Sequence, residues 1–227
     1  FLVFKMSSKV LKTVIFMGSA RDITPPWGGE SRLGNRVLKW VTNVVKERNN
    51  ELNGVNITHD VTVYDPLEVF SEGGPLAVSG AELRAPHFFY GSGQAPPSMD
   101  DMAQTLRDAD CFLVVTPEYN HTIPPALTSM MGHFGSSCFG FKPSGIITYS
   151  AGPWGGSRVA MALRPFLSEL GCLPVSKLAI FPTPDEYLNQ DGTVSDPNSR
   201  LLKQLPELLS QVEWWAVAAS NQRAAGN

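Results

Sequence analysis

The sequence predicts an α/β fold in which five parallel strands form a doubly wound sheet within a three-layer α/β/α sandwich. Short apolar runs alternate with helical patterns along the chain, which is the arrangement that βαβ units produce. Hydrophobic residues make up 43% and charged residues 17% of the 227 residues, enough for one buried core. No internal repeat or linker divides the sequence. We therefore expect a single domain over residues 12–217, flanked by tails at 1–11 and 218–227.

Each element is predicted from its own local pattern. The expected strands, arranged in the sheet order 2-1-3-4-5, are residues 13–17, 57–64, 111–115, 145–149 and 178–181. The third run is continuously apolar, which indicates a strand buried on both faces. Apolar residues at helical spacing predict helices near residues 33–44, 98–109, 124–134, 157–171 and 199–219. Residues 70–98 are rich in Gly and Pro and show no comparable periodicity.

Composition excludes several classes of function. The formal net charge is −3, from 18 basic and 21 acidic residues, so neither nucleic acid nor an acidic membrane surface is an expected partner. No run reaches the roughly 18 apolar residues that a membrane-spanning helix needs. The three cysteines are widely spaced and odd in number, which favours a reducing, cytoplasmic location. The four histidines and three cysteines show no metal-ligand spacing, so no metal site is expected.

Ligands of doubly wound sheets bind beyond the carboxyl ends of the strands, where the strand order reverses. The loop after the first strand contains Gly18-Ser-Ala-Arg21 and later Ser31-Arg-Leu-Gly34. Hydroxyls of Ser19 and Ser31, the Arg21 guanidinium and helix amides could surround a phosphate. The same residues would also suit a plain strand-to-helix turn with a polar surface. Neither GxGxxG nor GxxxxGK[ST] occurs, so dinucleotide and P-loop fingerprints are missing.

Two further loops carry residues suited to a flat, heteroatom-rich ring. Thr116-Pro-Glu-Tyr-Asn120 follows the third strand, where Tyr119 offers a stacking face and the backbone amides of Glu118 to Asn120 offer donors. Ser150-Ala-Gly-Pro-Trp-Gly-Gly156 follows the fourth strand, and its glycines allow the backbone to approach a ligand closely. A rigid turn and a flexible loop are the alternatives. Together the three loops predict one site for such a ring with a phosphate.

Three motifs carry a resemblance to a known family. They are GSAR with the later SRLG, PEYNHTIPPAL at 117–127, and YSAGPWGGSRVAMALRPFLSELG at 149–171. The chain resembles the NADPH-dependent FMN reductase family, a flavodoxin-like group that includes azoreductases, quinone reductases and chromate-reducing enzymes. The resemblance covers roughly residues 12–213. It departs from the family in a longer segment between Arg21 and Ser31 and in the run Leu127-Thr-Ser-Met-Met-Gly132, which lacks the usual Lys, Asn and Asp of a subunit contact.

The resemblance implies a set of FMN-binding residues. The phosphate loop would comprise Ser19, Arg21, Ser31, Leu33 and Gly34. The ribityl and isoalloxazine loop would comprise Pro117, Glu118, Tyr119 and Asn120. The loop beside the flavin ring would contribute Ser150, Gly152 and Gly155.

The resemblance also implies an activity. Hydride would pass from NADPH through bound FMN to a small acceptor such as a quinone, an azo compound, a metal oxyanion or free flavin. Because the flavin supplies the chemistry, no catalytic acid or base is assigned. A homodimer or homotetramer is expected. The alternatives are a flavin-binding electron carrier without a nicotinamide site, which a charge of −3 does not favour, and a regulatory protein that lost turnover.

Overall fold

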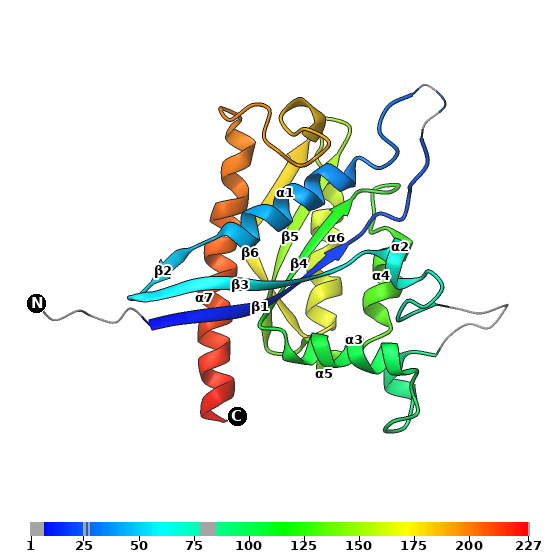
Figure 1. Ribbon diagram of the computed structural model, residues 1–227, viewed down its shortest axis with the longest axis vertical. Coiled ribbons are helices and arrows are strands. Elements are labelled where there is room, and N and C mark those ends of the chain that lie inside the picture. The colour runs from blue at the N-terminus through cyan, green and yellow to red at the C-terminus, as the bar shows by residue number, and fades with distance from the viewer. Residues whose placement is uncertain (1–6, 25, 27, 78–84, 227) are drawn as a thin grey trace, which may run out of the picture.

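A six-stranded sheet lies at the centre of the computed structural model, which describes residues 7–24, 26, 28–77 and 85–226 (Figure 1). The strands, in their order across the sheet, are β2 (Asn50–Leu52), β3 (Val55–Tyr64), β1 (Ser7–Met17), β4 (Cys111–Pro117), β5 (Lys142–Ser150) and β6 (Cys172–Pro182). Neighbouring strands from β3 to β6 are parallel. The α/β class expected from the sequence is confirmed.

The expectation of a five-stranded, wholly parallel sheet was wrong, because β2 adds a sixth strand antiparallel to β3 at one edge. Asn53 and Gly54 connect the two strands with φ values of 53° and 77°. Two consecutive positive φ values define the tight turn that matches the twist of a β-hairpin, and Asn-Gly is its preferred sequence. This dipeptide was therefore the available signal for β2.

Helices cover both faces of the sheet (Figure 1). One face packs against α1 (Gly34–Glu47) and α7 (Gln204–Ala225). The other packs against α3 (Pro97–Asp108), α4 (Pro125–Gly132), α5 (Ser136–Phe139) and α6 (Ser157–Glu169). Strand side chains alternate between the two cores, as the pleat requires. In β1, for example, Ile15 lies in the α1/α7 core and Phe16 in the opposite core.

The shorter elements and the chain ends complete the architecture. Helix α2 (Pro66–Val69) follows β3, and single 3₁₀ turns η1 (His87–Phe89), η2 (Pro184–Glu186) and η3 (Arg200–Lys203) occur in the connections. Strand β1 begins at Ser7 and α7 ends at Ala225, so both extend past residues 12–217. Among the described residues, none of the helices is both long and apolar enough to cross a membrane.

A buried polar cluster ties α7 to the edge of the sheet. Glu213 of α7 is fully buried and accepts hydrogen bonds from Arg48, from Asn50 at 2.6 Å and from the His59 ring at 3.1 Å. The other ring nitrogen of His59 lies 2.8 Å from the Thr13 hydroxyl. Burial alone would raise the pKa of Glu213, but the hydrogen bonds from His59 and Arg48 outweigh it and lower that pKa.

Strand register places the functional loops together. Met17 pairs with Val115, and Pro117 pairs with Tyr149, so β1, β4 and β5 end at the same edge of the sheet. Because parallel strands share their direction, the loops that follow them leave from that edge side by side. The architecture therefore brings the three candidate loops to one place.

Candidate functional site

A cavity of about 560 Å³ lies at this edge of the sheet. Nine of the twelve predicted site residues line it: Ser19, Arg21, Ser31, Leu33, Gly34, Pro117, Glu118, Tyr119 and Ser150. The remaining lining residues are Ile23, Glu30, Arg32, Tyr149 and Ala151. The three loops, far apart in the sequence, therefore form one concave surface of a size typical of ligand sites.

The first loop is joined to the second through Tyr119. The Ser19 hydroxyl lies 2.8 Å from the Tyr119 hydroxyl, and the Arg21 guanidinium lies 3.9 Å from the centre of the Tyr119 ring. The Ser31 hydroxyl donates to Asp22 at 2.7 Å. These contacts place one hydroxyl and one cation beside an aromatic face, and the Ser31 hydroxyl lines the same cavity, which is a combination suited to a phosphate next to a flat ring.

Gly18 and Gly34 are both needed where they stand, because a larger side chain would collide with the site. A Cβ on Gly18 would lie 2.1 Å from the Thr116 hydroxyl oxygen, so the turn after β1 could not approach β4 as it does. A Cβ on Gly34 would lie 2.0 Å from the Tyr149 hydroxyl oxygen and 2.2 Å from Cε of Met17. The start of α1 therefore packs directly against the end of β5.

Arg32 is a residue that sequence reasoning missed. It is buried, its guanidinium forms an ion pair with Asp65 at the end of β3, and it also donates to the backbone carbonyl of Ser19. The Nε atom of Arg32 is buried and has no hydrogen-bond partner among the described residues. No local pattern could have shown this role, since Asp65 lies far away in the sequence, at the start of α2.

Tyr149 was also missed, because an apolar ring near the end of a buried strand looks like ordinary core. Its side chain is buried, and its hydroxyl has no hydrogen-bond partner within the described part of the chain. Burial raises the pKa of Tyr149 above its ordinary value, so the hydroxyl remains protonated. A neutral donor without a partner in the lining of a cavity is a feature that a polar ligand atom would satisfy.

Glu118 joins the second loop to the start of α6. Its carboxylate accepts hydrogen bonds from the backbone N–H groups of Arg158 at 3.0 Å and Val159 at 3.3 Å, and the Arg158 guanidinium lies 3.3 Å away. A carboxylate at a helix N-terminus also interacts favourably with the helix dipole. Glu118 therefore holds two loops of the cavity together, and Arg158 is engaged in that contact.

Three predicted residues do not line the cavity. Asn120 has a φ of 50° and forms, with His121, the tight turn between Tyr119 and Thr122. The carbonyl of Gly152 accepts a hydrogen bond from the Ser150 hydroxyl at 2.8 Å. Gly155 has a φ of 59°, and its carbonyl accepts from the Thr148 hydroxyl at 2.8 Å. All three positions shape the loops around the cavity.

Comparison with known proteins identifies the family. The family model for NADPH-dependent FMN reductase matches residues 11–183 of this chain. The chain belongs to the NADPH-dependent FMN reductase family. Membership of this family implies FMN and NAD(P)H as cofactors.

Individual relatives agree with this assignment. A probable NADPH:quinone oxidoreductase 1 of Oryza sativa subsp. japonica is 31% identical over 130 residues, which cover 54% of this chain and 64% of the relative. A 2-hydroxy-1,4-benzoquinone reductase of Burkholderia is 30% identical over 105 residues, covering 44% and 54%. This chain thus spans less than two thirds of the length of these curated relatives.

Solved structures show the same fold. The flavoenzyme FerB of Paracoccus denitrificans, an NAD(P)H:(acceptor) oxidoreductase, superimposes with a TM-score of 0.62 at 18% identity, covering 90% of this chain and 97% of FerB. An NADH:FMN oxidoreductase covers 92% of this chain at a TM-score of 0.55 and 12% identity. At these identities the likeness concerns the fold, and it supports the flavodoxin-like α/β architecture.

The lining of the cavity fits the FMN that the reductase family uses. Ser19, Ser31 and Arg21 supply hydroxyls and a cation for a phosphate, and Tyr119 supplies an aromatic face. The buried hydroxyl of Tyr149 and the buried Nε of Arg32 are donors that still lack an acceptor among the described residues. A phosphorylated, heteroatom-rich ring provides acceptors for such groups.

Proposed function

We propose that this member of the FMN reductase family is an NAD(P)H oxidoreductase that passes hydride from NADPH through bound FMN to a small acceptor, with quinones as the favoured class. The observation that carries the proposal is the single cavity formed by three loops, whose lining keeps two buried donors without partners. The quinone class is supported by the names of the rice and Burkholderia relatives. Bound FMN supplies the hydride chemistry, and the protein binds and orients it.

Each loop has a separate task in this proposal. Ser19, Arg21 and Ser31 bind the phosphate, for which Arg21 leaves its position over the Tyr119 ring. Uncovered in this way, Tyr119 offers its face to the ring system. Glu118 acts as a positioning residue, because its carboxylate is used in contacts with the start of α6.

Packing at the edge of the sheet places one further hydrogen-bond donor beside the first loop. Gly34 lets α1 approach β5, so that the Tyr149 hydroxyl lies next to the first loop. This hydroxyl stays protonated because burial raises the pKa of Tyr149, and it therefore serves as a hydrogen-bond donor. Pro117, Leu33 and Ser150 complete the lining.

The proposal is tested by absorbance spectroscopy of the purified protein. FMN is added first, and NADPH or NADH is then added without oxygen. We expect a protein-bound flavin band that NADPH bleaches and that a benzoquinone restores. Bleaching by dithionite alone would instead indicate an electron carrier, and no binding of FMN at micromolar excess would show that the cavity is not a flavin site.

Assembly and location remain predictions. We expect a homodimer or homotetramer, as is common in the family, and light scattering of the FMN-loaded protein measures its mass. A monomeric mass would contradict the expected assembly without affecting the flavin proposal. The predicted cytoplasmic location is likewise independent of the chemistry proposed for the cavity.

A further inference from the structure

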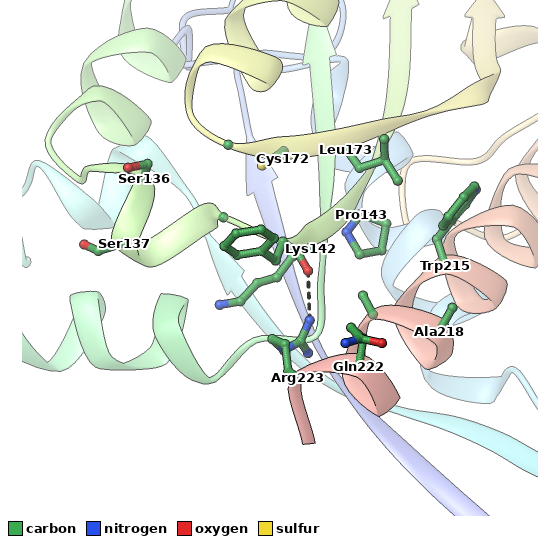
Figure 2. A pocket seen from close by; sticks show the side chains of 14 residues that line it. Ser136, Ser137, Lys142, Pro143, Cys172, Leu173, Trp215, Ala218, Gln222 and Arg223 are labelled. Carbon is green, nitrogen blue, oxygen red and sulfur yellow. Dashed lines mark hydrogen bonds between the residues drawn. The ribbon is translucent and has the colours of Figure 1, made fainter. Parts of the chain in front are cut away.

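A second cavity, of about 870 Å³, lies at the amino ends of β5 and β6 beside the carboxyl-terminal half of α7 (Figure 2). Its apolar lining includes Phe141, Pro143, Leu173, Trp215, Ala218 and Ala219. Lys142 begins β5 here, whereas Ser150 ends the same strand in the flavin site. At the usual rise per residue the two sites are roughly 25 Å apart. The second cavity is therefore separate from the one proposed to bind FMN.

Phe141 is held at the second cavity in a costly conformation. Its φ is 61°, a left-handed value that is rare for a bulky aromatic residue, and its side chain is 73% exposed. The Arg223 guanidinium donates to the Phe141 carbonyl at 2.9 Å, which holds this turn. Backbone strain of this kind concentrates at sites that clamp a ligand. Trp215 supplies a second exposed aromatic side chain to the same lining.

The charges at the second cavity are of one sign. Lys142 and Arg223 are its charged lining residues, and neither Asp nor Glu lines it. Arg223 lies 3.0 Å from Asp110, which balances that cation in part. This contact and the one to Phe141 use two of the five N–H donors of the guanidinium. The cavity therefore offers a cation with donors in reserve beside aromatic and aliphatic surface.

Lys142 adds a positive charge that the described residues do not pair. Its buried ammonium donates to the carbonyls of Leu106 at 2.6 Å, Arg107 at 2.6 Å and Cys138 at 3.0 Å. No carboxylate of the described residues lies within ion-pair distance of it. Three carbonyls at the carboxyl ends of α3 and α5 satisfy its hydrogen bonds and offset its charge in part. Lys142 and Arg223 together give this cavity a positive potential that attracts anions.

We propose that the second cavity binds a flat aromatic molecule that carries one carboxylate. Its ring packs against Phe141 and Trp215, and its carboxylate faces the side of the cavity where Arg223 and Lys142 lie. A volume of this size is typical of sites for small molecules, which are mostly apolar with few polar groups. This binding is independent of the reductase proposal, since it uses neither the flavin nor its loops.

Two probes that differ only in charge test the proposal. Isothermal titration calorimetry of the FMN-loaded protein compares naphthalene-2-carboxylate with naphthalene-2-methanol, which has the same ring system and no charge. We expect one carboxylate bound per chain and at least about tenfold weaker binding of the alcohol. Equal affinity for the two probes, or no binding of the carboxylate up to about 1 mM, would overturn the proposal.

A matched pair of variants locates the bound probe. Leu173 is 45% exposed in the lining, and both Leu173→Glu and Leu173→Gln remove its apolar surface. Only Leu173→Glu adds a negative charge, so it is expected to weaken the carboxylate about tenfold relative to Leu173→Gln, with no such difference for the alcohol. Equal binding of the carboxylate by the two variants would place the probe elsewhere, for instance over the flavin, and would contradict the proposal.

Phe141→Gly separates binding from folding. Glycine adopts a φ of 61° without strain, so this variant is expected to keep the melting temperature and the FMN affinity of the parent protein. Removing the ring should nevertheless weaken naphthalene-2-carboxylate about tenfold, because an aromatic wall of the cavity is lost. Unchanged affinity for the carboxylate in this variant would contradict the role given to Phe141.

Discussion

Arg32 and Asp65 form a two-point ion pair beneath the first loop of the proposed flavin site, although they are 33 residues apart in the sequence. The two nitrogen–oxygen distances are 2.5 and 2.8 Å, and both side chains are largely buried. The same guanidinium donates to the Ser19 carbonyl. The end of β3 therefore determines where the first loop, which leaves β1, is held.

Asp65→Asn is expected to lower the free energy of unfolding by about 3 kcal/mol in the absence of FMN, because it leaves a buried guanidinium without its counter-charge. The amide oxygen can still accept the hydrogen bond from the Leu67 N–H at the start of α2, so the cap of that helix is kept. Bound FMN should reduce the loss, since its phosphate brings negative charge to the same loop. Urea unfolding with and without FMN measures both values.

Asp108→Asn is the control for this prediction. Asp108 pairs with Lys12 at 3.5 Å, with side chains 47% and 58% exposed, so its loss should change stability by less than about 0.5 kcal/mol. If FMN left the effect of Asp65→Asn unaltered, Arg32 would have no electrostatic connection to the phosphate.

Gly34→Ala is expected to weaken FMN binding at least about tenfold. The added Cβ would lie 2.0 Å from the Tyr149 hydroxyl oxygen, so α1, β5 or the hydroxyl must move. Gly132→Ala is the matched control, because a Cβ there meets no atom within 4 Å. Fluorescence titration with FMN compares the variants. If helix propensity alone decided the effect, both substitutions would raise the free energy of unfolding by up to about 1 kcal/mol. A stabilised Gly34→Ala variant would contradict the close packing described.

Glu118→Ala should weaken FMN binding about tenfold, whereas Glu118→Gln should retain most of the affinity. A glutamine oxygen can still accept from the backbone N–H groups of Arg158 and Val159, which both contact one carboxylate oxygen of Glu118. Equilibrium titration with FMN measures the affinities. Rescue by glutamine would show a positioning role, and equal loss in both variants would show that the negative charge itself is required.

Stability is expected to fall as the pH drops below about 5, in part through Glu213. Its folded-state pKa is lowered, so its contribution is complete above the pKa of the unfolded chain, near 4.3, and is lost as the pH falls through the folded value. This loss is measured by urea unfolding between pH 3 and 7, with the midpoint determined at steps of about one pH unit.

Glu213→Gln should flatten that dependence on pH and lower stability at neutral pH by about 3 kcal/mol, because Arg48 loses its buried partner. Glu207→Gln on the same helix serves as control, since Glu207 is 55% exposed and pairs with Lys177 at the surface. An acid-induced loss as steep in Glu213→Gln as in the parent protein would assign the effect to other carboxylates.

The sequence predicted those residues of the candidate site whose position follows from the local sequence pattern. Ser19, Tyr119 and Ser150 follow apolar runs whose ends can be read directly, and parallel strands bring such ends together. Arg32 could not be assigned, because its burial depends on Asp65 at the start of α2, far away in the sequence. Tyr149 could not be assigned either, since the direction of a hydroxyl at a strand end depends on packing against Gly34.

The fold was predictable to a similar extent. Alternating strand and helix patterns indicated the layers, because each element buries an apolar face of its own period. Strand β2 was missed because three residues carry too little pattern, although Asn53-Gly54 marks its turn. Asn120 was predicted to belong to the loop that binds the flavin, and its left-handed conformation, which places it at the corner of the turn, could not be predicted from the sequence.

The cluster around Glu213 has a consequence for protein synthesis. Arg48, Asn50 and His59 leave the ribosome 154 to 165 residues before the carboxylate that pairs with them. At 5–20 residues per second this delay lasts roughly 8–30 s. Throughout that time the nascent amino-terminal strands carry three polar groups that cannot be buried without cost. Completion of the fold therefore waits for α7. A ribosome that stalls before Glu213 would leave a chain whose β2–β3 edge of the sheet stays accessible to chaperones and proteases.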